Sequence, residues 1–250
     1  MSRLTAFLLA GSLLVGLASD ASAQTTHTND QPQSLPMPHM MDDAFFVHGI
    51  LNQLEGRFGD TSNFRWSGEA WAGTDENKVW LRTEGRLADG QVDDGIQELF
   101  YARSISTYFN ALIGARYDLD SLPGRGWGAI GIEGLAPQFF RIGITGYVSG
   151  DGHLGAKIEG SYDLLITQRL IVQPQFEMNF YTKDDPARHV GAGLSELDVG
   201  LRLRYEITRE FAPYIGVTYL GQFGNTATYV SESGGQPNQV RFVAGVRAWF

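Results

Sequence analysis

The segment ahead of the first predicted strand carries side chains that could bind a metal ion. Residues 36–43 hold three of the five methionines in the chain, together with one histidine and two aspartates. Thioether sulfur is a soft ligand that selects Cu(I), imidazole suits copper, and carboxylates favour harder cations. The spacing also fits an ordinary, weakly apolar tail, and taken alone it favours that simpler interpretation. The candidate metal ligands are Met37, His39, Met40, Met41, Asp42, Asp43 and, a little further along, His48.

A second group of ionisable side chains recurs at alternate positions along later segments, with apolar residues between them. This alternation places the ionisable residues together on one face of a β-strand. An open selective pore usually has an excess of one sign of charge at its constriction, whereas acidic and basic residues are here about equally frequent. We therefore expect mainly an internal network of ion pairs, through which small hydrated ions could still pass. The predicted network contains Glu69, Arg82, Glu84, Arg116, Glu133, Arg141, Lys157, Glu159, Glu177, Glu196, Asp198, Arg202, Arg204, Glu206, Arg241 and Arg247.

Several classes of chemistry lack the residues that they require. The chain has no cysteine, which excludes disulfides, zinc-thiolate sites and a catalytic thiol. It also has no Gly-x-Ser-x-Gly motif, phosphate-binding loop or zinc-protease helix motif. A lipase would need a serine and a histidine at one depth on an outer face, and His153 and His189 fall in a turn and a long loop. The formal net charge of −9 disfavours nucleic acid as a partner. We therefore predict that the protein is not an enzyme and binds no nucleic acid.

The elements that must position these residues are β-strands. From about residue 44 onward, apolar and polar residues alternate strictly over runs of about eight to ten positions, and helical periodicity is absent. Strands of this length, when tilted, can cross a membrane. We expect about twelve of them, an even number as in bacterial single-chain barrels. They are predicted near 44–58, 63–72, 78–87, 96–105, 108–118, 127–134, 140–149, 153–165, 169–181, 194–206, 211–220 and 239–250.

The last predicted strand indicates which face lies outside. Apolar residues occupy every second position from Phe242 to Phe250, and Arg241 and Arg247 lie on the opposite face. A membrane barrel is apolar outside and polar inside. A terminal phenylalanine on such a strand also resembles the signal that outer-membrane proteins present to their assembly machinery. We therefore expect an all-β fold, a transmembrane antiparallel up-and-down β-barrel in the cell outer membrane, surrounded by its lipid.

Aromatic residues at both membrane interfaces would form girdles on the outside of such a barrel. The girdle candidates are Phe64, Trp66, Trp80, Tyr117, Trp127, Tyr205, Tyr219 and Phe250.

The N-terminal residues have the pattern of a secretory signal peptide. Arg3 supplies a positive charge, residues 4–17 are apolar, and Ala21-Ser22-Ala23 places small residues at the cleavage site. The predicted organisation is a signal peptide at 1–23, a short disordered tail containing Met and His at 24–43, and the barrel at 44–250.

The predicted connections are of two kinds. Short turns near 106–107, 167–168 and 208–209 are expected in the periplasm, and longer loops near 88–95, 119–126, 182–193 and 221–238 outside the cell.

Similarity to a known protein family extends over nearly all of residues 41–250 and is most specific from 194 to 217. The segments that carry it are Met41-Asp42-Asp43 with Gln53-Leu54-Glu55, Gly134-Leu135-Ala136-Pro137, Tyr162-Asp163-Leu164-Leu165 with Thr167-Gln168-Arg169-Leu170, Gly200-Leu201-Arg202-Leu203-Arg204-Tyr205-Glu206-Ile207, Arg209-Glu210-Phe211-Ala212-Pro213-Tyr214-Ile215-Gly216, Phe223-Gly224-Asn225-Thr226-Ala227 and the closing Arg-x-Trp-Phe. Together they resemble the copper resistance protein B family.

The resemblance implies an outer-membrane barrel that contributes to copper tolerance in the periplasm, with an N-terminal Met/His region thought to bind copper. Here that region is short, with about 17 residues between the predicted cleavage site and Met41. The expected function is copper resistance through binding copper ions, exporting them from the periplasm, or both, with copper as cargo or ligand rather than catalytic cofactor. A periplasmic copper oxidase or carrier is a candidate partner. The alternative is a small-solute outer-membrane channel with no metal role.

Overall fold

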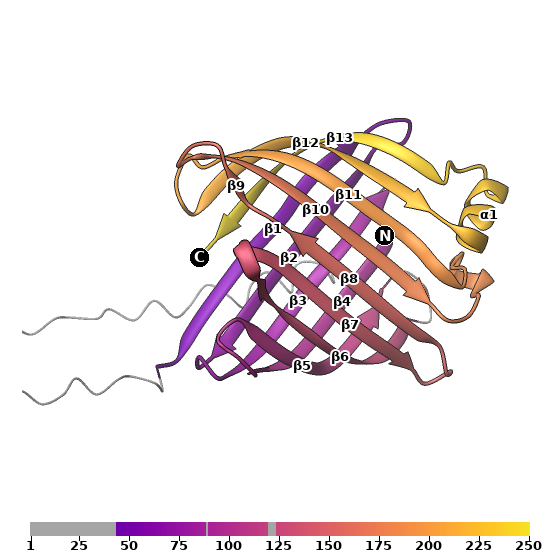
Figure 1. Ribbon diagram of the computed structural model, residues 1–250. Coiled ribbons are helices and arrows are strands. Elements are labelled where there is room, and N and C mark those ends of the chain that lie inside the picture. Colours follow the sequence, from indigo (N-terminus) through magenta and orange to yellow (C-terminus); the bar gives the residue numbers. More distant parts are fainter. Residues whose placement is uncertain (1–43, 89, 120–123) are drawn as a thin grey trace, which may run out of the picture. The chain divides into compact units, whose positions relative to one another are not determined.

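The computed structural model describes residues 44–88, 90–119 and 124–250, which form one antiparallel sheet closed on itself (Figure 1). The strands follow one another around the wall in sequence order, and β1 pairs with β13 to close it. β8 and the two-residue β9 both pair with β10, so the 13 strands occupy twelve positions in the wall. The strands are β1 (Phe46–Phe58), β2 (Asn63–Gly73), β3 (Asn77–Ala88), β4 (Gln91–Ser104), β5 (Phe109–Asp118), β6 (Arg125–Ala136), β7 (Phe140–Ser149), β8 (Leu154–Ser161), β9 (Leu164–Leu165), β10 (Leu170–Tyr181), β11 (Gly193–Tyr205), β12 (Phe211–Gln222) and β13 (Asn238–Trp249).

The wall is apolar outside and charged inside, which is the reverse of a soluble protein. On β11, Leu201 and Leu203 are 54% and 40% exposed, while the intervening Arg202 is 1% exposed. Successive side chains of a strand point to opposite faces, so the exposed leucines face outward and the arginine faces the interior. An apolar exterior around a polar interior is the pattern of a transmembrane barrel. The predicted fold class is therefore confirmed.

The two ends of the barrel differ in their connections. Short turns, including the 3₁₀ turn Pro137–Phe139, join the strands at one end, where β1 also begins and β13 ends. We call this the turn end. The opposite, loop end carries the longer connections at 182–192 and 223–237. Short turns face the periplasm in outer-membrane barrels and long loops face outward.

One predicted loop is wrong, because residues 88–95 do not form a long connection. β3 ends at Ala88 and β4 begins at Gln91, and these two residues pair across the hairpin. Gly90 has a φ of 76°, a left-handed conformation that glycine adopts without steric cost. The strands therefore continue to a tight turn at this point.

The sequence shows no helical periodicity, but one of the predicted long loops contains a short helix. Helix α1 (Gly224–Glu232) lies in the connection between β12 and β13. A nine-residue helix is marginal in isolation and gains its stability from tertiary contacts. Thr226 supplies such contacts, because its Oγ1 lies 2.8 Å from Ser195 Oγ and accepts the backbone N–H of Gly191 at 2.7 Å. No helix in the described part of the chain is long and apolar enough to span a membrane.

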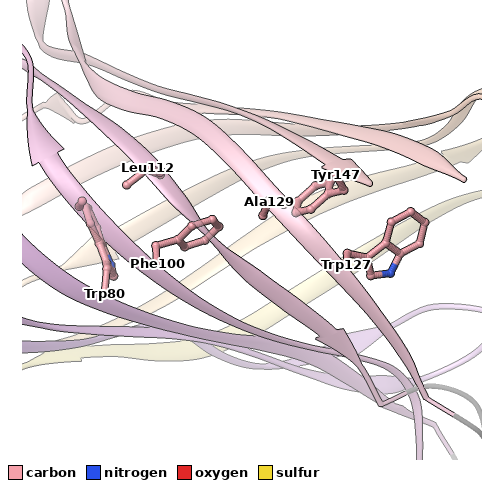
Figure 2. Close-up of a cluster of buried hydrophobic side chains, with 7 residues drawn as sticks. Trp80, Phe100, Leu112, Trp127, Ala129 and Tyr147 are labelled. Carbon is pink, nitrogen blue, oxygen red and sulfur yellow. The ribbon is translucent and has the colours of Figure 1, made fainter. Parts of the chain in front are cut away.

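Part of the inner wall is apolar rather than charged. A cluster of buried side chains lies on the inner faces of β3 to β7 (Figure 2). It includes Trp80 and Trp127, which sequence reasoning assigned to the outer girdle. Trp127 Nε1 donates to Asp118 at 2.7 Å, so its polar atom is satisfied inside the barrel. The two tryptophans are therefore interior residues. Their aromatic character suggested the outer girdle, whereas strand alternation places Trp80 on the same inward face as Arg82 and Glu84.

Candidate functional site in the barrel interior

Two cavities lie in the interior among the described residues, one toward each end of the barrel. The turn-end cavity has a volume of about 510 Å³ and reaches Phe139 and Leu165 near the short turns. The loop-end cavity has a volume of about 420 Å³ and is lined in part by loop 182–192 and by Thr226 of α1. Ionisable side chains of both signs line both cavities. These cavities are the candidate functional site.

Arg82 is the centre of the ion pairs in the turn-end cavity. Its guanidinium lies 3.9 Å from Glu69 and 3.5 Å from Glu159, and it also contacts Glu133. The same group stacks 4.8 Å over the ring of Trp80, a cation–π contact. β3 thus presents one cation to carboxylates from three other strands, which fixes both the charge and the shape of this wall.

A second cation, Lys157, extends the same network along the wall. Its Nζ lies 2.5 Å from Glu84 Oε1 and 3.6 Å from Glu159 Oε2. On the neighbouring β7, Arg141 is 48% exposed and its Nη1 lies 3.7 Å from Glu69. Arg141 is thus held more loosely than Lys157.

Arg65 of β2 connects strands that are not neighbours in the wall. Its Nη2 donates to Glu177 of β10 at 2.8 Å, and its Nη1 donates to Asp198 of β11 at 3.0 Å. Glu84 lies 4.0 Å from the same guanidinium. The Arg65 side chain therefore crosses part of the barrel interior.

The loop-end cavity is held by two arginine–aspartate groups. Arg86 pairs with Asp94 at 2.8 Å and with Glu196 at 3.3 Å. Arg116 pairs with Asp118 at 2.6 Å, and Asp118 also accepts Arg188 of loop 182–192 at 3.1 Å.

Further contacts tie loop 182–192 to the barrel. Arg125 at the start of β6 lies 2.6 Å from Asp185. The backbone N–H of Ala192 donates to the carboxylate of Asp184 at 2.7 Å. This hydrogen bond, together with one from the Asn225 side chain, holds the pKa of Asp184 below its usual range.

Replacing Arg125 by glutamine is expected to loosen loop 182–192 without unfolding the barrel. The side chains of Arg125 and Asp185 are 18% and 11% exposed, so loss of their ion pair should cost at least the roughly 1 kcal/mol of a well-placed surface pair, and trypsin should cleave this loop at least about fivefold faster in the variant. Limited proteolysis of the reconstituted protein measures this rate. The matched control is Arg209→Gln at the turn end. Trypsin should cleave loop 182–192 of this variant at the wild-type rate. Equal rates in all three proteins would show that the ion pair does not hold the loop.

The most deeply buried charges were missed by sequence reasoning. Glu55 and Arg57 of β1 have fully buried side chains, and Arg57 Nε donates to Glu55 at 2.8 Å. Arg202 donates two hydrogen bonds to Glu55, at 2.8 and 2.9 Å. Asp198 accepts Arg57 at 2.7 Å and the Thr218 hydroxyl at 2.5 Å. We call Glu55, Arg57, Asp198 and Arg202 the buried quartet.

The remaining predicted network residues lie mostly toward the ends of the barrel. Arg204 pairs with Asp163 at 3.0 Å and lies 3.7 Å from Glu206. Arg241 donates to Thr61 at 3.1 Å and contacts Gln239. Neither Arg241 nor Arg247 forms an ion pair within the described residues. These two arginines of the closing strand therefore stand apart from the network of carboxylates.

Of the predicted metal ligands, only His48 belongs to the described residues. Met37, His39, Met40, Met41, Asp42 and Asp43 lie outside them. The imidazole of His48 stands between two indole rings, with centroids 5.9 Å from Trp71 and 5.8 Å from Trp249. Across residues 44–88, 90–119 and 124–250, no group of three or more His, Asp or Glu side chains is arranged to hold a metal ion.

Comparison with solved structures supports the barrel architecture. The structure described as the NanC porin matches with a TM-score of 0.53 and 14% sequence identity, covering 81% of this chain and 99% of that chain. Identity at this level shows the fold alone. The match agrees with the apolar exterior and supports a transmembrane β-barrel.

Sequence comparison assigns the family. The family described as "Copper resistance protein B precursor (CopB)" matches residues 45–250. Copper resistance protein B of Escherichia coli is 42% identical over 210 residues, which are 84% of this chain and 71% of that protein. The copper resistance protein B homolog of Pseudomonas syringae pv. tomato is 36% identical over 234 residues, 93% of this chain and 77% of that protein. The chain therefore belongs to the copper resistance protein B family.

Proposed function

We propose that this outer-membrane barrel contributes to copper resistance by binding copper ions at its periplasmic end and exporting them from the periplasm. The observation that carries the proposal is family membership over residues 45–250, with relatives that are themselves named copper resistance proteins. The same membership and the barrel fold support a role without catalysis.

The proposed copper ligands are the thioether and imidazole side chains of residues 37–48. β1 begins at Phe46, so His48 is the third residue of this strand and lies at the turn end of the wall. In the sequence it follows closely after the candidate ligands at 37–43. Met37, Met40 and Met41 would supply soft thioethers, and His39 with His48 would supply imidazoles. The indole faces of Trp71 and Trp249 beside His48 would favour a cation at this position.

Asp42 and Asp43 would add negative charge to the same site and attract the cation. Copper is here a ligand or cargo and not a catalytic cofactor. A periplasmic copper oxidase or carrier would be a natural partner, because the short turns and the start of β1 lie at the same end of the barrel. The assembly machinery of the outer membrane would recognise the closing strand that ends in Phe250.

Titration of the full-length mature protein with Cu(I) tests the binding step. Saturable binding is expected, and replacing Met37, Met40 and Met41 together by alanine should weaken it at least about tenfold, which corresponds to about 1.4 kcal/mol. His48→Ala should weaken it in the same direction. Met178→Ala is the matched control, because Met178 lies in the middle of β10. Absence of saturable Cu(I) binding in the unchanged protein would disprove the proposed site.

The export step has its own test. Cells that lack the barrel should accumulate more periplasmic copper at fixed external copper, and expression of the barrel should restore the lower amount. An unchanged amount would contradict export and leave binding as the contribution. The alternative function, a small-solute channel without a metal role, predicts conductance in planar bilayers together with no effect on periplasmic copper.

A further inference from the structure

The two interior cavities meet at a small set of charged side chains. Within the described lining, Arg65, Glu84 and Glu177 are the residues that border both cavities. They come from β2, β3 and β10. In the wall, β2 and β10 are separated by β1, β13, β12 and β11, so a contact between their side chains has to reach across the interior. We call these three residues the septum.

Ion pairs connect the three residues of the septum across the barrel interior. Arg65 donates to Glu177 at 2.8 Å and lies 4.0 Å from Glu84. The second guanidinium nitrogen donates to Asp198 at 3.0 Å, and Lys157 neutralises Glu84 at 2.5 Å. The side chain of Arg65 is only 9% exposed. The guanidinium is therefore fixed from two directions and occupies space between the cavities.

We propose that the septum is a gate, in which the ion pairs of Arg65 close the passage between the turn-end and loop-end cavities. An ion that moves from one cavity to the other has to pass these charges, and it can do so only if the Arg65–Glu177 contact opens. Coulomb interactions are stronger in a partly buried site than in bulk water, so the closed arrangement is favoured at rest. The gate acts on any small hydrated ion and does not depend on the proposed copper function.

The charges of the septum predict opposite selectivities for two variants. Removing the charge of Arg65 leaves Glu84 and Glu177 bordering both cavities, with Lys157 as the cation that adjoins Glu84. Acidic residues around a constriction favour cations. Removing the charge of Glu177 instead leaves Arg65 and Lys157 with one carboxylate fewer, which shifts the preference toward anions.

Conductance of the purified barrel in planar bilayers with a KCl gradient tests the gate. Arg65→Gln should raise the mean conductance about tenfold, equivalent to a barrier lower by about 1.4 kcal/mol, and should shift the reversal potential toward the K⁺ equilibrium value. Glu177→Gln should also raise the conductance, with a reversal-potential shift toward the Cl⁻ value. Arg65→Lys keeps the charge and should stay much closer to wild type.

Arg116→Gln is the matched control, because Arg116 is a buried, ion-paired arginine that borders only the loop-end cavity. Its conductance should remain near the wild-type value. Heat-modifiable migration in gel electrophoresis confirms that each variant is folded before it is measured.

The gate is disproved if Arg65→Gln and Glu177→Gln conduct like wild type, or if Arg116→Gln raises the conductance equally. It is also disproved if both septum variants shift the reversal potential in the same direction. Because Arg65→Gln and Glu177→Gln are independent substitutions, either one that folds is sufficient for the comparison with Arg116→Gln.

Discussion

Replacing Glu55 by alanine is expected to destabilise the folded barrel by about 3–5 kcal/mol, because it leaves buried arginines without their shared carboxylate. Glu55 accepts Arg57 at 2.8 Å, accepts Arg202 twice at 2.8 and 2.9 Å, and accepts the Tyr214 hydroxyl at 2.9 Å. The side chains of Glu55 and Arg57 have no exposed surface, and that of Arg202 is 2% exposed. Water cannot replace the lost partner at these positions.

The free energy of unfolding in urea, measured in lipid vesicles, gives the size of this effect. Glu55→Gln should cost less than Glu55→Ala, because the amide keeps the shape and one hydrogen-bond acceptor but loses the charge. Glu232→Ala on the exposed face of α1 is the control and should change the free energy by less than about 0.5 kcal/mol. A cost below about 1 kcal/mol for Glu55→Ala would mean that the buried quartet contributes little to stability.

Strict alternation does not reveal Glu55 and Arg57, the two members of the buried quartet on β1, because β1 contains a bulge. Ile50 pairs with Glu69 and Leu51 with Gly68, but the next pair is Gln53 with Ser67. Asn52 is therefore an extra residue, and the residues after it lie on the opposite face from the one that strict alternation assigns. If strict alternation is counted from the inward-facing His48, Glu55 and Arg57 fall on the outer face, where they would contact lipid.

Elsewhere in the barrel, alternation was a sufficient guide. In β11 and β13 no register shift is present along the pairs with β12, and the predicted inward positions of Arg202, Arg204 and Arg241 agree with their burial. The ion-pair partners of Arg202 and Arg204 could not be predicted, since they come from other parts of the sequence. Arg202 pairs with a residue 147 positions away, and only closure of the barrel brings the two together.

Replacing Leu201 by arginine is expected to destabilise the barrel by about 2–4 kcal/mol in a lipid bilayer, because it places a charge in the hydrocarbon region. Leu201 is 54% exposed, and it pairs with Pro174 of β10 and Val217 of β12 on the outer face of the wall. At a similarly exposed position of a soluble protein, the same substitution would change the free energy by less than about 0.5 kcal/mol. The size of the change in unfolding free energy therefore shows whether lipid or water surrounds the outer face of the wall.

The control is Ser231→Arg, which adds the same side chain at an exposed position of α1 at the loop end. This variant should unfold like wild type in urea, since α1 lies in a connection between strands and not in the wall. Both variants add one positive charge to the same protein, so a difference between them measures the cost of placing that charge against lipid. Equal unfolding free energies for Leu201→Arg and Ser231→Arg would contradict a lipid-facing position for β11. If only Leu201→Arg lowers the unfolding free energy, the loss comes from placing a charge on the apolar outer face and not from the change in net charge.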